Sequence, residues 1–226
     1  MTVEEFIHGA RLSLVDDDGT HWSDEELIRY IDLGYSAIVA HRPDAHSKLI
    51  VLACEPGPMQ IIPQEERGAM LLTVKRNLIL VPDSDPEEYR SGRPPRLISG
   101  DLADNLMDSW YLASPSSDSQ IDEYIYDDRL PDRFYVYPNA TSNTRLELAI
   151  STLPNKHDPG DLSEAIQISP RYISALNHYV LFKAYTKDAQ GAHSEKLAML
   201  HLQSFNSAMG IKTQVDYHAR PAPMED

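Results

Sequence analysis

Apolar residues near the start of the chain recur every three or four positions, which is the spacing of one face of an α-helix. In the first such stretch the spacing runs from Val3 to Leu14, and Thr2 and Glu5 have the spacing of a capping box at its beginning. The pattern predicts a helix over residues 2–14.

The strongest helix signal follows an acidic turn, in the segment DGTHWSDEEL at 18–27. Ser23 occupies the N-cap position and Glu26 comes three residues later, which is a second capping box. Trp22 and Leu27 occupy the two positions of a hydrophobic staple. We therefore expect a second helix that starts at Ser23 and ends before the proline at position 43, because proline disfavours helical geometry in the residue before it.

Between about residues 45 and 160 the pattern changes to short apolar runs separated by polar, proline-containing segments. Such runs are typical of strands, and the run at 145–151 alternates so regularly that one of its faces should be exposed. Turn-forming residues at 138–143 predict a hairpin, Ser99 begins a short predicted helix, and 83–95 should be an exposed loop. The predicted strands cover residues 48–54, 60–62, 70–74, 77–81, 124–126, 134–137 and 145–151.

Helical spacing returns from about residue 170. Ser169 is placed as an N-cap with Pro170 at the first helical position, and a break at 188–191 separates this helix from a last one. Gly210 is placed to end that last helix. Residues 211–226 show no periodicity, and we expect them to be extended or disordered unless a partner orders them.

Two helices at each end of the chain and strands between them predict an α+β fold. In this prediction the four helices form a four-helix bundle, which carries an inserted β-rich subdomain. The bundle domain would comprise residues 1–44 and 165–210, the β-rich subdomain residues 45–164, and an extended C-terminal tail residues 211–226.

Charge and composition narrow the possible partners. The chain has 35 acidic and 20 basic residues, a net charge of −15, which argues against binding to nucleic acid or to an anionic membrane. An acidic wall could still line a passage through which DNA slides. The single cysteine, Cys54, lies in an apolar run and is expected to be a small buried hydrophobic residue. Because no signal peptide begins the chain and no apolar run approaches about 18 residues, we expect a soluble protein of the cytoplasm.

Motifs for chemistry are absent from the sequence. The nine histidines form neither H-x-H nor H-E-x-x-H. The acidic turn at 16–19 resembles a calcium loop, but that register would place Leu14 at the first ligand position. Nucleophile, P-loop and dinucleotide motifs are also missing. We therefore expect no catalytic, cofactor-binding or metal site, and no enzymatic activity.

A cluster of aromatic residues leaves two interpretations open. It contains Tyr124, Tyr126, Phe134, Tyr135 and Tyr137. Such a cluster can form a carbohydrate-binding face, as in a ligand-binding module of a tail fibre, or it can consist of strand residues packed in a small β core and a subunit interface. A third class, a small hydrolase that uses an acidic pair, would require a pocket.

Several separated segments together resemble the phage head–tail adaptor, or connector, family, of the podovirus type found beneath the portal. They are DGTHWSDEEL (18–27), RPDA (42–45), RNL (76–78), DSW (108–110), YIYD (124–127), DRFYVYP (132–138) and YVLFKAYTKD (179–188). The resemblance spans about residues 10 to 210, and the chain departs from the family in the segments 83–95 and 114–120.

The resemblance implies a structural protein of the virion, located at the head–tail junction after synthesis in the host cytoplasm. Twelve copies would form a ring that binds the portal protein, the tail tube or nozzle protein and neighbouring copies. DNA would pass through the lumen without specific binding, and no membrane would be involved. We expect portal and neighbour contacts at Ile211, Val215, Tyr217, Pro221 and Pro223, and tail-side contacts at Tyr124, Tyr126 and Tyr135.

Overall fold

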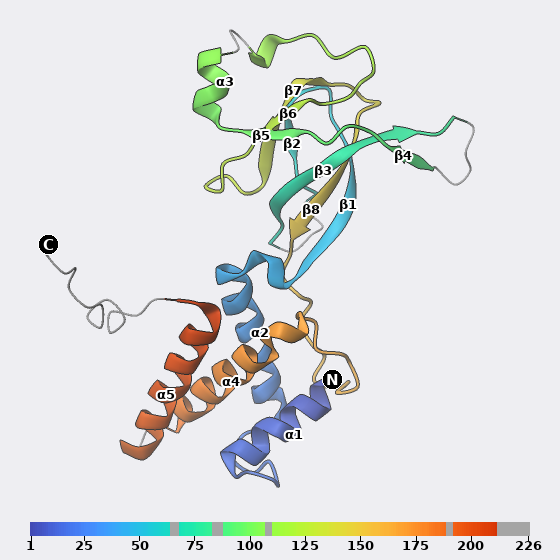
Figure 1. Cartoon of the computed structure of the whole chain (residues 1–226). Helices are drawn as coiled ribbons and strands as arrows, with labels where there is room; N and C mark the ends of the chain where they lie inside the picture. Colours follow the sequence, from blue (N-terminus) through green and yellow to red (C-terminus); the bar gives the residue numbers. More distant parts are fainter. Residues whose placement is uncertain (64–67, 83–87, 107–109, 189–191, 212–226) are drawn as a thin grey trace, which may run out of the picture. The chain divides into compact units, whose positions relative to one another are not determined.

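The computed structural model describes residues 1–63, 68–82, 88–106, 110–188 and 192–211. The chain divides into two compact units (Figure 1). One unit combines Met1–Ala45 with the chain from Pro154 onward and is helical, and the other, His46–Leu153, is built mainly of strands. The protein is therefore α+β. None of the helices in the described ranges is long and apolar enough to cross a membrane.

The first helix, α1 (Val3–Leu14), begins at the predicted capping box. The Thr2 hydroxyl accepts a hydrogen bond from the backbone N–H of Glu5 (3.2 Å), and the Glu5 carboxylate accepts one from the N–H of Thr2 (2.9 Å). The residues of the predicted apolar face are buried. This prediction is confirmed.

The second helix, α2 (Asp24–His41), forms one of the two hydrogen bonds of the predicted capping box. The Ser23 hydroxyl accepts a hydrogen bond from the N–H of Glu26 (3.3 Å). The Glu26 carboxylate instead accepts bonds from the Tyr30 hydroxyl (2.7 Å) and the Lys187 ammonium (2.5 Å). A charged donor forms the stronger bond, so Glu26 joins α2 to the C-terminal part of the unit. The helix ends at His41, before the short 3-10 helix η1 (Pro43–Ala45), as expected.

The C-terminal part of the helical unit contains the 3-10 helix η3 (Pro170–Tyr172), α4 (Ile173–Lys187) and α5 (Ala192–Met209). Gly210 ends α5 with a left-handed backbone, φ +69°. The N–H groups of Gly210 and Ile211 donate to the carbonyls of Ser207 (3.0 Å) and Asn206 (2.8 Å). These two bonds form a Schellman motif, so the predicted role of Gly210 is confirmed.

The predicted four-helix bundle is wrong. α4 packs against α1, α2 and α5, whereas α5 packs mainly against α4. Two apolar side chains of α5, Met199 and Leu200, are consequently about half exposed, at 52% and 54%. A four-helix bundle requires four apolar stripes that face one shared axis. The spacing of apolar residues identifies a stripe on each helix, but it does not say which helix covers that stripe.

The second unit contains two four-stranded sheets. The first has the order β1-β8-β3-β4 and the second β2-β7-β6-β5, and all neighbours are antiparallel except β5 and β6. The strands are β1 (Ser47–Ala53), β2 (Gly57–Ile61), β3 (Met70–Leu80), β4 (Tyr89–Ser91), β5 (Arg96–Ile98), β6 (Glu123–Ile125), β7 (Arg133–Ala140) and β8 (Arg145–Ser151). The short helix α3 (Gly100–Leu106) and the 3-10 helix η2 (Trp110–Leu112) lie between β5 and β6 in the sequence.

Both sheets contribute side chains to one core. Leu52, Val74 and Leu148 come from the first sheet, and Tyr124 and Phe134 from the second. Cys54 belongs to the same core, as expected, and burial raises the pKa of its thiol to about 12. The thiol therefore stays protonated at neutral pH and is a poor nucleophile.

The strand predictions need three corrections. The predicted strands 70–74 and 77–81 form the single strand β3, which two register shifts interrupt. The predicted loop 83–95 contains β4, while its residues 83–87 lie outside the described residues. β7 and β8 belong to different sheets, so the predicted hairpin at 138–143 is wrong. A turn closed by a bond from the N–H of Thr144 to the carbonyl of Thr141 (3.0 Å) carries the chain from one sheet to the other.

Candidate functional site

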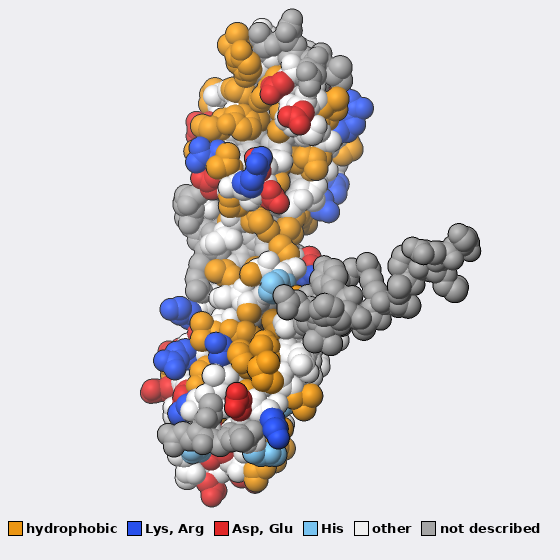
Figure 2. Space-filling view, turned by 90° about the vertical axis from the view of Figure 1, so that its left-hand side faces the viewer, with side chains coloured by type: hydrophobic (Ala, Val, Ile, Leu, Met, Phe, Trp, Pro, Cys, Tyr) orange, Lys and Arg blue, Asp and Glu red, His pale blue; other side chains and the backbone are white. Residues whose placement is uncertain are grey.

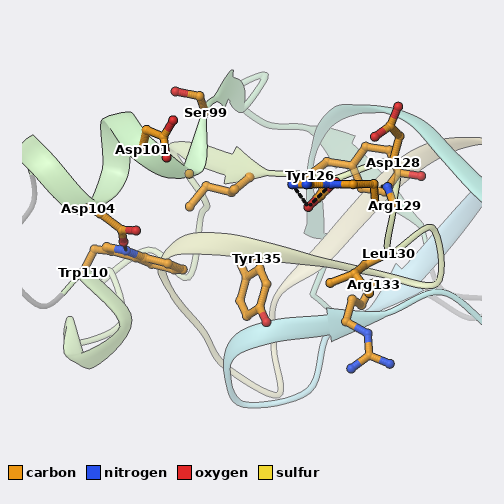
Figure 3. A pocket seen from close by; sticks show the side chains of 13 residues that line it. Ser99, Asp101, Asp104, Trp110, Tyr126, Asp128, Arg129, Leu130, Arg133 and Tyr135 are labelled. Carbon is orange, nitrogen blue, oxygen red and sulfur yellow. Dashed lines mark hydrogen bonds and ion pairs between the residues drawn. The ribbon is translucent and has the colours of Figure 1, made fainter.

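The candidate interaction surface is a hollow of about 520 Å³ on the second sheet (Figure 3). It lies on the face opposite to the core, because Phe134 and Val136 of β7 point into the core and Tyr135 between them lines the hollow. Its lining residues are Ser99, Gly100, Asp101, Asp104, Trp110, Ile125, Tyr126, Asp127, Asp128, Arg129, Leu130, Arg133 and Tyr135.

Two aromatic rings form the centre of this surface. The Trp110 ring meets the Tyr135 ring edge-on, with 5.8 Å between centroids and an interplanar angle of 86°. The Trp110 indole N–H donates to the Asp104 carboxylate (2.9 Å), and this bond ties η2 to α3. Figure 3 shows Tyr135 between Trp110 and the arginines. An aromatic pair with a hydrogen-bonded indole is typical of protein interfaces and of ligand-binding faces.

Charged groups at the other end of the surface are paired with each other. Arg129 donates to both carboxylate oxygens of Asp127 (2.8–3.2 Å), and Arg133 donates to both of Asp132 (2.8 and 3.0 Å). The bonds from Arg129 hold the pKa of Asp127 below its usual range, and those from Arg133 do the same for Asp132. These two carboxylates are ionised at neutral pH, so they are poor general acids. The arrangement suits the recognition of a surface.

The structure separates the three tyrosines that we expected at the tail-side interface. Tyr124 is only 5% exposed and its hydroxyl lies 3.2 Å from that of Thr73, inside the core. Tyr126 and Tyr135 both line the candidate surface, and burial raises the pKa of Tyr126. Only two of the three side chains are therefore placed to meet a partner.

The expected portal-side residues lie mostly beyond the described part of the chain. Ile211 packs against the core of the helical unit, whereas Val215, Tyr217, Pro221 and Pro223 lie outside the described residues. Their interface role stays a prediction.

Sequence reasoning missed Trp110, Arg129 and Arg133 as members of the surface. Trp110 belongs to the DSW segment, but nothing in its local sequence places it against Tyr135, which is 25 positions away. Arg133 carried a usable signal: it alternates with the core residue Phe134, which places it on the same face as Tyr135.

A buried polar cluster in the helical unit resembles catalytic machinery and acts as a structural link. The Tyr35 hydroxyl accepts the N–H of Gln167 (3.0 Å) and forms a hydrogen bond with Nε2 of His157 (2.9 Å). Nδ1 of His157 forms a hydrogen bond with the Glu164 carboxylate (2.6 Å). The His157 side chain is completely buried, and burial raises the pKa of the Tyr35 hydroxyl. The cluster fixes the segment before α4 against α2.

The described residues provide no metal centre. No group of three or more histidine, cysteine, aspartate or glutamate side chains within them is arranged to hold a metal ion. His201 instead pairs with His178 across α4 and α5, with 3.1 Å between their Nδ1 atoms. The hollow beside Trp110 is thus the clearest candidate for a functional surface in the described part of the β unit.

In the described part of the β unit, these features form a surface of aromatic and charged side chains that is available for binding. The model of the SU10 adaptor protein family matches residues 1–225. The chain therefore belongs to the SU10 adaptor protein family and is a bacteriophage adaptor, a structural component of the virion. The comparison with curated proteins gave no match.

Proposed function

We propose that this protein forms a ring that joins the portal to the tail tube or nozzle at the head–tail junction. The family match over residues 1–225 carries this proposal. Twelve copies would close the ring, after synthesis in the host cytoplasm, and the protein would act by binding rather than by catalysis.

The two units supply different binding surfaces in this proposal. The surface around Tyr126, Tyr135 and Trp110 would contact the tail side, and the segment from Ile211 to the C-terminus would contact the portal and neighbouring copies. The net charge of −15 supports a lumen that DNA passes without binding, because like charges repel. On the face in Figure 2, acidic and basic side chains are interspersed among hydrophobic ones.

Measuring mass with and without portal particles tests the proposal. The purified chain and assembled portal rings are analysed separately and as a mixture by sedimentation velocity. We expect a complex whose added mass corresponds to a full set of adaptor copies. The proposal is wrong if the chain and the portal sediment independently at every concentration tested.

One observation favours a second candidate, a carbohydrate-binding module. The Trp110–Tyr135 pair with flanking carboxylates is a composition that sugar sites use. The test is whether the isolated chain binds glycans. If Trp110→Ala abolishes this binding while Tyr111→Ala does not, the surface around Trp110 is a carbohydrate-binding site rather than an adaptor contact. Tyr111 is a suitable control because it is adjacent and 53% exposed.

A further inference from the structure

Among the described strands, only β8 pairs with β1, so the outer edge of β1 has no described strand beside it. β1 pairs with β8 in a continuous antiparallel register from Ser47↔Ser151 to Ala53↔Arg145. It is the terminal strand of its sheet, and none of the described strands pairs with its other side.

The register shows which backbone groups point to that edge. The N–H of Thr152 donates to the carbonyl of His46 (3.1 Å), and the N–H of Cys54 donates to the carbonyl of Thr144 (3.0 Å). Both are directly opposed, hydrogen-bonded pairs at the two ends of β1. Because such pairs alternate along an antiparallel ladder, the even-numbered residues between them bond to β8. The N–H and C=O groups of residues 47, 49, 51 and 53 therefore point away from β8.

The side chains along this edge are also exposed. Leu49 and Val51 are 59% and 51% exposed, on the face opposite to Ile50 and Leu52, which pack on the core. Proteins usually shorten, bend or cover an edge of this kind, because it invites another strand.

The other outer strands show this protection. β4 and β5 have three residues each, and β2 is interrupted by a register shift between Gly57 and Met59. β1 has seven residues, no proline and no register shift. It is thus the outer strand, among those described, that is best suited to receive an added strand.

The C-terminal sequence has the pattern of such a strand. The segment 211–226 as a whole has no periodicity, but within it residues 214–220, QVDYHAR, alternate: the apolar residues Val215, Tyr217 and Ala219 stand between polar ones, and Pro221 follows. Alternation over seven residues indicates a strand with one apolar face, and its length matches that of β1. Residues 212–220 can span up to about 30 Å when extended, so the segment can extend well beyond the end of α5.

We propose that residues 213–220 of one copy add as a strand to the open edge of β1 in a neighbouring copy. The backbone groups of residues 49 and 51 would pair with the added strand, and its apolar face would extend the row formed by Leu49 and Val51. This contact joins two different surfaces, and such a contact forms a ring when its repetition around an axis closes. The assignment of the added strand to a neighbouring copy rests on the proposed ring function, whereas the pairing of residues 213–220 with β1 does not.

A peptide titration tests the pairing without the portal. A fluorescent peptide of residues 212–226 is titrated into the full chain and followed by anisotropy. We expect saturable binding that Val51→Pro and Val51→Lys weaken by at least about tenfold. Because the Val51 N–H does not bond to β8, both variants should fold, which far-UV circular dichroism verifies. Leu97→Lys, at a 60% exposed position of β5, is the matched control and should bind normally.

A second peptide with the same composition but without the alternation should bind weakly. The proposal is overturned if the native peptide shows no saturable binding, or if Val51→Lys and Leu97→Lys bind it equally.

Cross-linking identifies the copy that supplies the strand. Chains with Val51→Cys and chains with Tyr217→Cys are mixed, bound to portal particles and oxidised, since residues on adjacent strands lie within disulfide distance. We expect a covalent dimer only in the mixture. A dimer from Val51→Cys alone indicates β1 pairing with β1 of a second copy, and an internal bond in the double variant indicates the chain's own tail. Either result, or no cross-link in portal-bound protein, overturns the proposal, while failure to bind the portal counts against the proposed function.

Discussion

Asp16 organises the turn that leads into α2. Its carboxylate accepts the N–H groups of His21 and Trp22 (both 3.1 Å) and the Thr20 hydroxyl (3.3 Å), and it contacts the Arg11 guanidinium (3.1 Å). Burial alone would raise the pKa of Asp16, but the backbone bonds from Trp22 and His21 lower it overall. The acidic turn is therefore a set of hydrogen bonds around one carboxylate.

Replacing Asp16 should alter the acid stability of the protein. Because its pKa is lower in the folded state than in the unfolded state, Asp16 contributes stability above the ordinary aspartate pKa of about 3.9. This contribution is lost as the pH falls through the lower, folded value. We expect Asp16→Asn to be less stable than the wild type at pH 7, with a smaller difference at pH 3, in urea titrations. Asp17→Asn, at an exposed position, should match the wild type at both pH values.

Single residues were predictable where their partners are close in the sequence. Thr2 with Glu5 and Gly210 with Ser207 are three residues apart, and the structure has them as expected. The role of Glu26 was not predictable, because its partner Lys187 is 161 residues away. The position of Tyr124 depends on how β6 enters the core, which no local pattern specifies.

Two helical glycines have opposite surroundings. A Cβ at Gly34 of α2 would lie 2.5 Å from the Leu176 side chain of α4, whereas a Cβ at Gly9 of α1 would meet nothing within 4 Å. Leu176 is completely buried, so it has no free space to move into. Gly34 thus permits the close approach of α2 and α4.

We expect these two glycines to respond oppositely to alanine. Gly9→Ala should raise the free energy of unfolding by about 0.5–1 kcal/mol, because alanine has the higher helix propensity. Gly34→Ala should lower it by about 1 kcal/mol or more, because overpacking outweighs the same gain. Denaturant unfolding measures both values. A stabilised Gly34→Ala variant would contradict the inferred contact between α2 and α4.

The contact between α4 and α5 should weaken in acid. The Nδ1 atoms of His178 and His201 lie 3.1 Å apart, and the Tyr185 ring stacks on the His201 ring with 5.7 Å between centroids. Burial, and then the charge of His178, lower the pKa of His201. The folded protein therefore binds a proton at His201 less readily than the unfolded chain does. The contribution of neutral His201 to stability is fully present above the ordinary histidine pKa of about 6.5 and is lost as the pH falls below 6.5.

Thermal unfolding of the wild type and of His201→Gln at pH 7.5 and 5.5 tests this expectation. The wild type should lose more stability between the two pH values than the variant. His8→Gln, in the exposed part of α1, should behave like the wild type. Equal losses in all three proteins would exclude the histidine pair as the cause.

At the scale of elements, periodicity identified helices and many strands but not their neighbours. The residues of α1 and α2 were found because each carries its own stripe and cap. The predictions of a four-helix bundle and of a hairpin between β7 and β8 were wrong for the same reason. Each depended on which elements lie side by side, and the spacing of apolar residues does not contain that information. β4 and β5 were missed because their three residues show no period, whereas β6, which is equally short, was found from its aromatic residues.

For the whole molecule, the segment 212–226 offers a test that separates folding from assembly. The described members of both hydrophobic cores lie at or before Ile211, and we expect deletion of 212–226 to leave the melting temperature unchanged. The same deletion should weaken portal binding. Calorimetry and co-sedimentation measure the two effects. A lower melting temperature would assign the segment to the fold of the single copy.

The family and its structural role were within reach of the sequence, because separated motifs keep their order along the chain. The candidate surface was not, since Trp110, Arg129 and Tyr135 come from different segments. The fold of the β unit brings these three residues together, and their spacing in the sequence does not predict this.

The strand-rich unit begins and ends at adjacent positions. The N–H of Thr152 donates to the carbonyl of His46 (3.1 Å), and Nδ1 of His46 lies 2.9 Å from the Thr152 hydroxyl. An insert whose ends meet can be lost, enlarged or exchanged without stretching its host. Evolution can therefore vary the strand-rich unit independently, while the helical unit keeps its own sequence constraints.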